Sequence, residues 1–262
     1  MRNSVNDRAA WTLTGNVAEL RCEKLSARVD AQRPYAGVHN VAIDGGPHPL
    51  ELLRVYRSDR VNDHIADPSW VGDRKSPWPL PLVETYVRGT DLVASYQAED
   101  AWPFFPQLYW RAGSLNAVPG VIGSVSLLVS VQTHLLDTVP QIAVASRMKC
   151  EESLYISGRR APSPAATIES LSTEDDCCVV SRMKDLPLSY IEIMPAGDFH
   201  AVKPPAEKGD ALCEWRLFAE FLEKGVIRRA RIHAAIVPRE RDLEIAAACC
   251  EAIDRLELPL TT

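Results

Sequence analysis

The feature that most restricts the fold of this chain is a short run in which apolar and polar residues alternate, and which recurs along most of the sequence. Each run is rich in Val, Ile, Leu, Tyr and Trp and is bounded by Gly, Pro, Asp or Asn. Alternation with period two is typical of β-strands, and the bounding residues are typical of turns. Long helical periodicity is missing between residues 11 and 237, so this region predicts an antiparallel, all-β fold rather than alternating strands and helices.

Compact turns separate the predicted strands. Gly89-Thr90 predicts a two-residue type II′ hairpin, because glycine at the first central position permits a positive φ angle. The segment 43–53, "IDGGPHPLELL", predicts a second turn. The expected strands are 17–30, 37–44, 50–56, 83–88, 91–97, 105–112, 123–133, 140–148, 152–157, 177–183, 189–195 and 226–237.

The C-terminal region contains one ambiguous segment and one helix. Residues 213–222 fit both a helix and a strand; we predict a strand, because 223–225 ("EKG") is typical of a turn leading into the next strand. After Pro238, helical spacing predicts a helix at about 240–256 that packs on the outside of a sheet. Its expected buried residues are Leu243, Ala246, Ala247, Cys250 and Ile253. The predicted fold is a large antiparallel β-sandwich, one domain over residues 1–262, with a C-terminal α-helix.

Composition and motifs exclude several classes of function. The net charge of −6 argues against a protein that grips nucleic-acid phosphates. No apolar run matches a signal-peptide core or a membrane span, so we expect a cytoplasmic protein without a membrane partner. Seven cysteines without a C-x-x-C pair indicate reduced packing residues, and the six histidines lack ligand spacing, so no metal is expected. Nucleotide-binding and nucleophile-elbow motifs are absent, and no cofactor is expected.

Polar residues form rows along several predicted strands. In the strand 226–237, Arg229, Arg231 and His233 share one face, because successive side chains of a strand alternate sides. Ile232, Ala234 and Ile236 then face the core. Comparable rows elsewhere are Glu84, Tyr86 and Arg88; Gln107, Tyr109 and Arg111; and Tyr190 and Glu192. A serine row in 123–133 (Ser124, Ser126 and Ser130, with Gln132) is interpreted as a solvated stripe.

Three interpretations of the arginine and histidine row remain open. It is a solvated sheet face, a nucleic-acid patch, or one wall of a ligand site. If several of the rows lie side by side, their guanidinium, carboxylate and aromatic groups suit a polyhydroxylated ligand. On that hypothesis the ligand is a carbohydrate or a similar polar metabolite, and the candidate binding residues are Glu84, Arg88, Tyr109, Arg111, Arg229 and Arg231.

The many antiparallel strands with polar residues along a sheet face resemble the galactose-mutarotase-like β-supersandwich, a carbohydrate-binding superfamily. The resemblance implies a sugar-active isomerase, epimerase or lyase in which a strand glutamate acts as base and a histidine as acid. Glu192 in "SYIEIMP" then corresponds to the glutamate, and His233 or His200 to the acid. The paired-histidine motif of the enzymes is not found here. The C-terminal part, "WRLFAEFLEKGVIRRARI" with "VPRE" and Thr261-Thr262, resembles an uncharacterised bacterial family.

The alternative function is a non-catalytic protein-interaction or structural β-sandwich without a small-molecule ligand, in which the polar rows are ordinary wet surface. The segment 59–82 bears on this choice, because it holds four prolines and two tryptophans, Trp70 and Trp78. It is either a surface excursion whose tryptophans pack on the body, a rim beside a binding face, or a docking segment for another subunit in a possible homo-oligomer.

Overall fold

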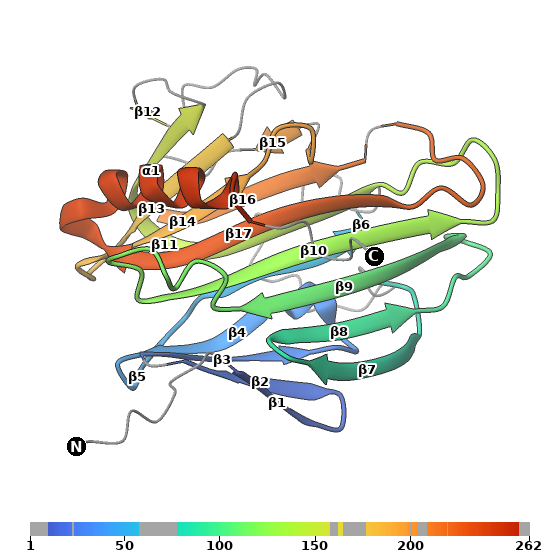
Figure 1. The fold of residues 1–262 in the computed structure, drawn as a ribbon, viewed down its shortest axis with the longest axis horizontal. Helices are drawn as coiled ribbons and strands as arrows, with labels where there is room; N and C mark the ends of the chain where they lie inside the picture. Colours follow the sequence, from blue (N-terminus) through green and yellow to red (C-terminus); the bar gives the residue numbers. More distant parts are fainter. Residues whose placement is uncertain are drawn as a thin grey trace.

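The computed structural model describes residues 10–22, 24–57, 78–157, 162–164, 177–199, 201–203, 209–218 and 220–256. In these residues the chain forms seventeen antiparallel strands and one α-helix, α1 (Asp242–Ile253), preceded by a 3-10 turn at Arg239–Arg241 (Figure 1). The strands are β1 (Ala10–Thr14), β2 (Val17–Arg21), β3 (Leu25–Asp30), β4 (Val38–Ile43), β5 (Gly46–His48), β6 (Glu51–Arg57), β7 (Leu82–Arg88), β8 (Asp91–Tyr96), β9 (Phe104–Ala112), β10 (Gly123–Thr133), β11 (Ile142–Ser157), β12 (Ser163–Pro164), β13 (Cys177–Met183), β14 (Leu188–Met194), β15 (Ala201–Lys203), β16 (Gly209–Leu217) and β17 (Arg228–Pro238).

The strands form two layers. The smaller layer is built from β1 to β5, each paired with its neighbour in sequence. The larger layer runs β7-β8-β9-β10-β17-β14-β13-β11, and β11 also pairs with β6 and β16. Strand β6 joins the layers, because it also pairs with β4. The predicted all-β, antiparallel sandwich with a C-terminal helix is confirmed.

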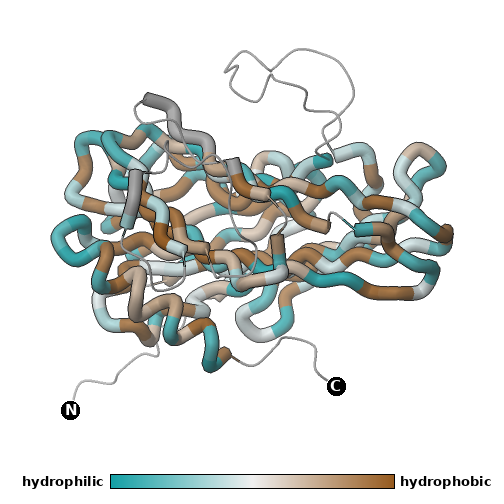
Figure 2. Tube along the Cα trace, turned by 90° about the horizontal axis from the view of Figure 1, so that it is seen from above, coloured by the Kyte–Doolittle hydropathy of each residue, from teal (hydrophilic) through white to brown (hydrophobic). Residues whose placement is uncertain are grey.

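The main hydrophobic core lies between the layers. It brings together Leu20 and Val29 of the smaller layer with Trp110, Leu127 and Ile232 of the larger one, all in one buried cluster. In Figure 2 hydrophobic stretches recur along the strands through the middle of the molecule. Burial of this apolar surface is the principal force that holds the two layers together. It also fixes which face of each strand is left for other contacts.

The predicted hairpin at Gly89-Thr90 is present. Arg88 pairs with Asp91 across a two-residue loop, and Gly89 has a φ angle of 60°. The second predicted turn joins β4 to β5 through Asp44 and Gly45, whose φ angles are 49° and 80°. Positive φ at both central residues is the conformation that Asp-Gly favours in tight hairpins.

Several strand boundaries differ from the predicted ones. The stretch 17–30 is two strands, because reciprocal backbone hydrogen bonds between Cys22 and Leu25 close a turn inside it. The predicted strands 140–148 and 152–157 form one long strand, β11, with an irregularity in its pairing to β13 between Cys150 and Glu152. The predicted strand 213–222 is confirmed as far as Leu217, after which Phe218 has a positive φ angle.

The helix α1 packs on the outer face of β13, β14 and β17, as predicted and as Figure 1 shows. Its buried apolar residues are Ile245, Ala246, Cys249 and Ile253. The predicted buried face is therefore partly wrong, because Ala247 is exposed whereas Ile245 and Cys249 are buried. Asp242, at the first turn of the helix, belongs to the same buried face and points toward the sheet rather than toward water.

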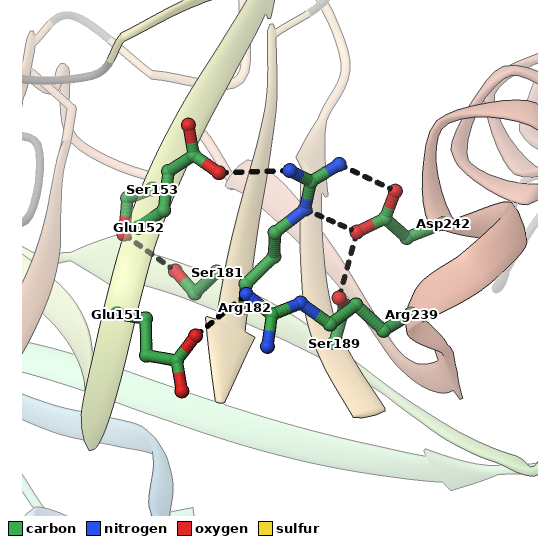
Figure 3. Close-up of polar contacts among 8 residues, drawn as sticks. All are labelled: Glu151, Glu152, Ser153, Ser181, Arg182, Ser189, Arg239 and Asp242. Carbon is green, nitrogen blue, oxygen red and sulfur yellow. Dashed lines mark hydrogen bonds and ion pairs between the residues drawn. The ribbon is translucent and has the colours of Figure 1, made fainter. Parts of the chain in front are cut away.

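A polar cluster holds Asp242 in that position (Figure 3). Arg182 of β13 donates to both carboxylate oxygens of Asp242, from Nε at 2.9 Å and from Nη2 at 3.2 Å. Ser189 of β14 donates to the same carboxylate at 2.8 Å, and Arg182 also donates to Glu152 of β11 at 2.8 Å. The cluster thus joins three strands to the start of α1.

Other expectations concern cysteines, tryptophans and membrane spans. None of the seven cysteines is in a disulfide, and five of them are buried. Trp78 is 3% exposed and packs against Tyr96 and Trp102, whereas Trp70 and the rest of 58–77 lie outside the described residues. In the described part of the chain, no helix has the length and apolar character needed to cross a membrane.

Candidate functional site

The register of five strands places the predicted polar rows side by side on the outer face of the larger layer. The strands are β7, β8, β9, β10 and β17, which follow one another in the sheet (Figure 1). Three transverse rows result: Arg88, Asp91, Arg111, Ser126 and His233; Tyr86, Val93, Tyr109, Leu128 and Arg231; and Glu84, Ser95, Gln107, Ser130 and Arg229.

A cavity of about 100 Å³ lies over the first two rows. Its walls include Arg88, Asp91, Tyr109, Arg111, Arg231 and His233. Two further wall residues come from outside the strands. Ser114 belongs to the loop between β9 and β10, and Leu256 follows the C-terminal end of α1. The cavity therefore exists because a loop and the residues after the helix rise beside the sheet face.

His233 lines the cavity and is 6% exposed. Its Nδ1 atom is 2.7 Å from Oγ of Ser126, and the Ser126 hydroxyl in turn contacts the hydroxyl of Ser114. Its Nε2 atom is buried and has no hydrogen-bond partner in the described residues. Burial, reinforced by the charges of Arg231 and Arg111, lowers the pKa of His233 to about 4. The imidazole is therefore neutral at neutral pH.

Two arginines of the cavity are held by carboxylates. Arg111 makes a bidentate pair with Asp91, with Nε–Oδ1 and Nη2–Oδ2 distances of 2.7 and 2.9 Å. Nε of Arg231 lies 2.8 Å from Oδ2 of Asp198, which also accepts a hydrogen bond from the Arg231 backbone N–H at 3.0 Å. Bidentate and charge-assisted contacts of this kind fix a guanidinium in one orientation. Both guanidinium groups are thereby held in place by the protein itself.

One wall of the cavity is largely apolar. Tyr109 and Leu128 line the cavity, and together with Val93 they form a buried cluster on the outer face of the sheet. The Tyr109 hydroxyl donates to the side-chain oxygen of Gln107 at 2.8 Å, and burial raises the pKa of Tyr109. A phenol that stays protonated beside apolar groups offers both a polar tip and a flat surface, which suits the mixed character of a sugar ring.

Glu192 is not part of this cavity. It lies opposite Ala234 of β17, on the side of the sheet that faces the core, whereas His233 is opposite Ile193 and faces outward. The expected convergence of Glu192 and His233 on one ligand is therefore wrong. Glu192 is 1% exposed, and its carboxylate accepts hydrogen bonds from Ser146, Tyr190 and Trp215. Burial nevertheless raises its pKa above the ordinary value.

The remaining predicted site residues divide into two groups. Arg88, Tyr109, Arg111 and Arg231 line the cavity together with His233. Glu84 and Arg229 lie in the third row, are exposed, and are not among the cavity walls. His200 lies outside the described residues. The sheet thus brings five of the predicted residues together at one place.

Sequence reasoning missed six residues of the site: Asp91, Ser114, Ser126, Leu127, Leu128 and Leu256. The serine row was expected to be solvated, but Ser124, Ser126 and Ser130 are 1%, 7% and 6% exposed. Asp91 directly follows the Gly89-Thr90 turn, and a two-residue hairpin at that turn pairs Asp91 with Arg88, so the turn was a signal that could have found it. No signal in the sequence brings Ser114 or Leu256 to the sheet face.

Comparisons with known proteins give distant structural similarities. No family model and no curated protein matches the chain. The fold is similar to YeaD of Salmonella typhimurium, described as a candidate mutarotase, with a TM-score of 0.47 and 9% identity over 90% of this chain and 95% of that chain. A TPR-domain containing protein from Parabacteroides distasonis has a TM-score of 0.47 and 8% identity over 84% of this chain and 47% of that one.

A third similar structure is the GH36 α-galactosidase AgaA of Geobacillus stearothermophilus, with a TM-score of 0.35 and 8% identity over 92% of this chain and 42% of that one. Similarity at these values does not assign a ligand or a reaction to this chain. The site is therefore interpreted from its own residues.

Proposed function

We propose that this protein binds a small carbohydrate or a similar polar metabolite in the cavity on the outer face of β7, β8, β9, β10 and β17. The observation that carries the proposal is His233, which lines the cavity and whose Nε2 atom is buried without a hydrogen-bond partner in the described residues. Leaving such an atom unpaired costs about 1–3 kcal/mol. A ligand hydroxyl relieves that cost, because it donates or accepts as the imidazole tautomer requires.

The burial of several polar groups in the first two rows favours a site over an ordinary wet surface. Asp91, Ser126 and His233 are 5%, 7% and 6% exposed, and Tyr109 of the second row is 8% exposed. A solvated sheet face would leave such groups open to water. The alternative, an interaction protein without a small-molecule ligand, offers no reason to enclose hydroxyl, imidazole and guanidinium groups around a shared cavity.

The position of Glu192 argues for binding rather than for mutarotase-type catalysis. That chemistry needs a carboxylate and an imidazole on either side of the bound sugar. The carboxylate of the cavity, Asp91, is already paired with Arg111, and Glu192 faces the core. We therefore assign binding to this site and do not assign a reaction to it.

A thermal-shift titration with a panel of monosaccharides and sugar acids tests the proposal. A ligand present at 100 times its Kd stabilises the native state by about 2.7 kcal/mol. At about 2–4 °C per kcal/mol for a chain of this size, the expected rise in Tm is about 5–10 °C. The variant His233→Ala is expected to lose the shift, and the matched control His134→Ala, at an exposed histidine away from the cavity, is expected to keep it. If no member of the panel raises the Tm at millimolar concentration, the proposal is wrong.

A further inference from the structure

The cavity carries more positive than negative charge. Arg88, Arg111 and Arg231 line it, whereas Asp91 is its single carboxylate among the described residues. Asp91 is engaged by Arg111, and Asp198 balances Arg231 from beside the cavity. No carboxylate in the described part of the chain forms an ion pair with Arg88, so its charge is left unbalanced. This local excess stands out in a chain whose net charge is −6.

The arginines of the cavity also have side-chain N–H donors that are not engaged by the described residues. Arg111 uses Nε and Nη2 for Asp91, and Arg231 uses Nε for Asp198. A guanidinium has five N–H donors in a fixed fork, so each of these side chains retains donors. Arg88 donates none of its side-chain N–H groups to a described residue. Planar N–H forks of this kind match a carboxylate better than they match a hydroxyl, because two parallel hydrogen bonds form to its two oxygens.

The histidine does not supply the positive charge itself. Its pKa of about 4, lowered by burial and then by Arg231 and Arg111, keeps the imidazole neutral at neutral pH. The guanidiniums are therefore the groups that attract an anion, and the imidazole with the nearby serine hydroxyls is the group that pairs with a neutral oxygen. The apolar surface of Tyr109 and Leu128 completes the set.

We propose that the ligand of this cavity is a sugar acid, a monosaccharide whose carboxylate is bound by Arg88 together with Arg111, which lies in the same row between Arg88 and His233, while Nε2 of His233 pairs with one of its hydroxyls. The inference rests on the proposed carbohydrate-binding function and names its ligand class. A cavity of about 100 Å³ accepts a ligand on the scale of one ring, so the site is expected to take a free hexuronate or a chain end rather than the interior of a polysaccharide.

The test is isothermal titration of the full chain with matched pairs, glucose against glucuronate and galactose against galacturonate, at constant ionic strength. At least one uronate is expected to bind about tenfold or more tightly than its neutral partner, the factor that a charge-assisted hydrogen bond provides. Arg88→Gln is expected to weaken binding of the uronate more than binding of the neutral sugar, and so to remove that preference. Arg21→Gln makes the same change in net charge at an exposed residue of β2, away from the cavity, and is expected to keep the preference.

The outcomes separate the two proposals. Equal affinity for the acid and the neutral sugar overturns the sugar-acid inference and leaves the carbohydrate-binding function in place. A preference for the acid that survives Arg88→Gln overturns the assignment of Arg88. Failure of every sugar and uronate to bind overturns both the inference and the proposed function. Acetate is titrated beside them, and binding of acetate as tight as that of glucuronate overturns the role of the hydroxyls.

Discussion

Replacing Arg182 by methionine is expected to destabilise the protein strongly, because it leaves the carboxylate of Asp242 buried without its cation. The Asp242 side chain is 3% exposed. Its carboxylate accepts three side-chain hydrogen bonds, two from Arg182 and one from Ser189 (Figure 3). After the change, the hydroxyl of Ser189 is its remaining side-chain donor. The start of α1 then carries an unpaired charge against the sheet.

The free energy of unfolding is expected to fall by about 3 kcal/mol. Removing one partner of a buried ion pair costs roughly 3–5 kcal/mol, and we take the lower end because the Arg182 side chain is 24% exposed and water can reach part of the vacated space. With an m-value of about 3 kcal/mol/M, the urea midpoint falls by about 1 M. Tryptophan fluorescence follows the unfolding, since the chain has six tryptophans. The control Arg255→Met, at a pair whose side chains are 79% and 73% exposed, is expected to leave the midpoint unchanged.

A second variant separates the lost charge pairing from lost packing. Arg182→Met/Asp242→Asn is expected to be more stable than Arg182→Met, because asparagine accepts the Ser189 hydrogen bond without carrying a charge. The reasoning is refuted if Arg182→Met lowers the midpoint by less than about 0.3 M, or if the double variant is the less stable of the two.

The pH dependence of the Arg182→Met effect follows from the same pair. Burial by itself raises the pKa of Asp242, but the hydrogen bonds from Arg182 and Ser189 more than offset this, and the net pKa is lowered. A carboxylate with a lowered folded-state pKa stabilises the protein above its unfolded pKa of about 3.9, and this contribution is lost as the pH falls through the folded-state pKa. The difference in free energy of unfolding between wild type and Arg182→Met is therefore expected to be largest near pH 7 and to shrink as the pH falls toward about 3.

Three further predictions concern other parts of the molecule. Gly37→Ala is expected to lower the urea midpoint far more than Gly15→Ala. Both glycines have φ near 60°, but a Cβ at Gly37 meets the Leu52 carbonyl oxygen at 2.2 Å, whereas one at Gly15 meets nothing within 4 Å. Equal losses in the two variants would contradict this reasoning. Because burial raises the folded-state pKa of Glu192 above that of the unfolded chain, wild type is expected to lose stability relative to Glu192→Gln in urea unfolding as the pH rises above about 4.3, the ordinary pKa of a glutamate. Stability curves that stay parallel would contradict this. In the native state a thiol reagent is expected to modify the partly exposed Cys22 and Cys250 first, since burial raises the pKa of thiols such as Cys249, to about 12; fast reaction of all seven thiols in a timed colorimetric assay would refute the burial.

The outer polar face could be predicted from the sequence because alternation along a strand is a local property. Arg229, Arg231 and His233 had to share one side of a strand, and Ile232 and Ala234 the other, whatever the strand paired with. The structure confirms both faces. The Gly89-Thr90 hairpin was predictable for the same reason, since the turn and its two strands lie within fifteen residues. One domain over the whole chain stays a prediction.

The place of Glu192 could not be predicted, because alternation does not say which face of a strand looks inward when both faces are buried. In β14 the apolar residues Ile191 and Ile193 pack beneath α1, and Tyr190 and Glu192 face the core. In a strand covered on one face alone, the apolar residues would face the core. Here both faces are covered, and the polar pair faces the core instead. Only the packing of α1 on this strand decided the matter.

The cavity itself depended on tertiary structure for a similar reason. His233 meets Ser126 across 107 residues of sequence, because β17 lies between β10 and β14 in the sheet. Ser114 and Leu256 come from a loop and from the residues after the helix. The sequence determined which side chains share each strand face, since that follows from backbone geometry over a few residues. The tertiary structure decided which strands are neighbours and what covers them, because burial of apolar surface between distant segments selects that arrangement.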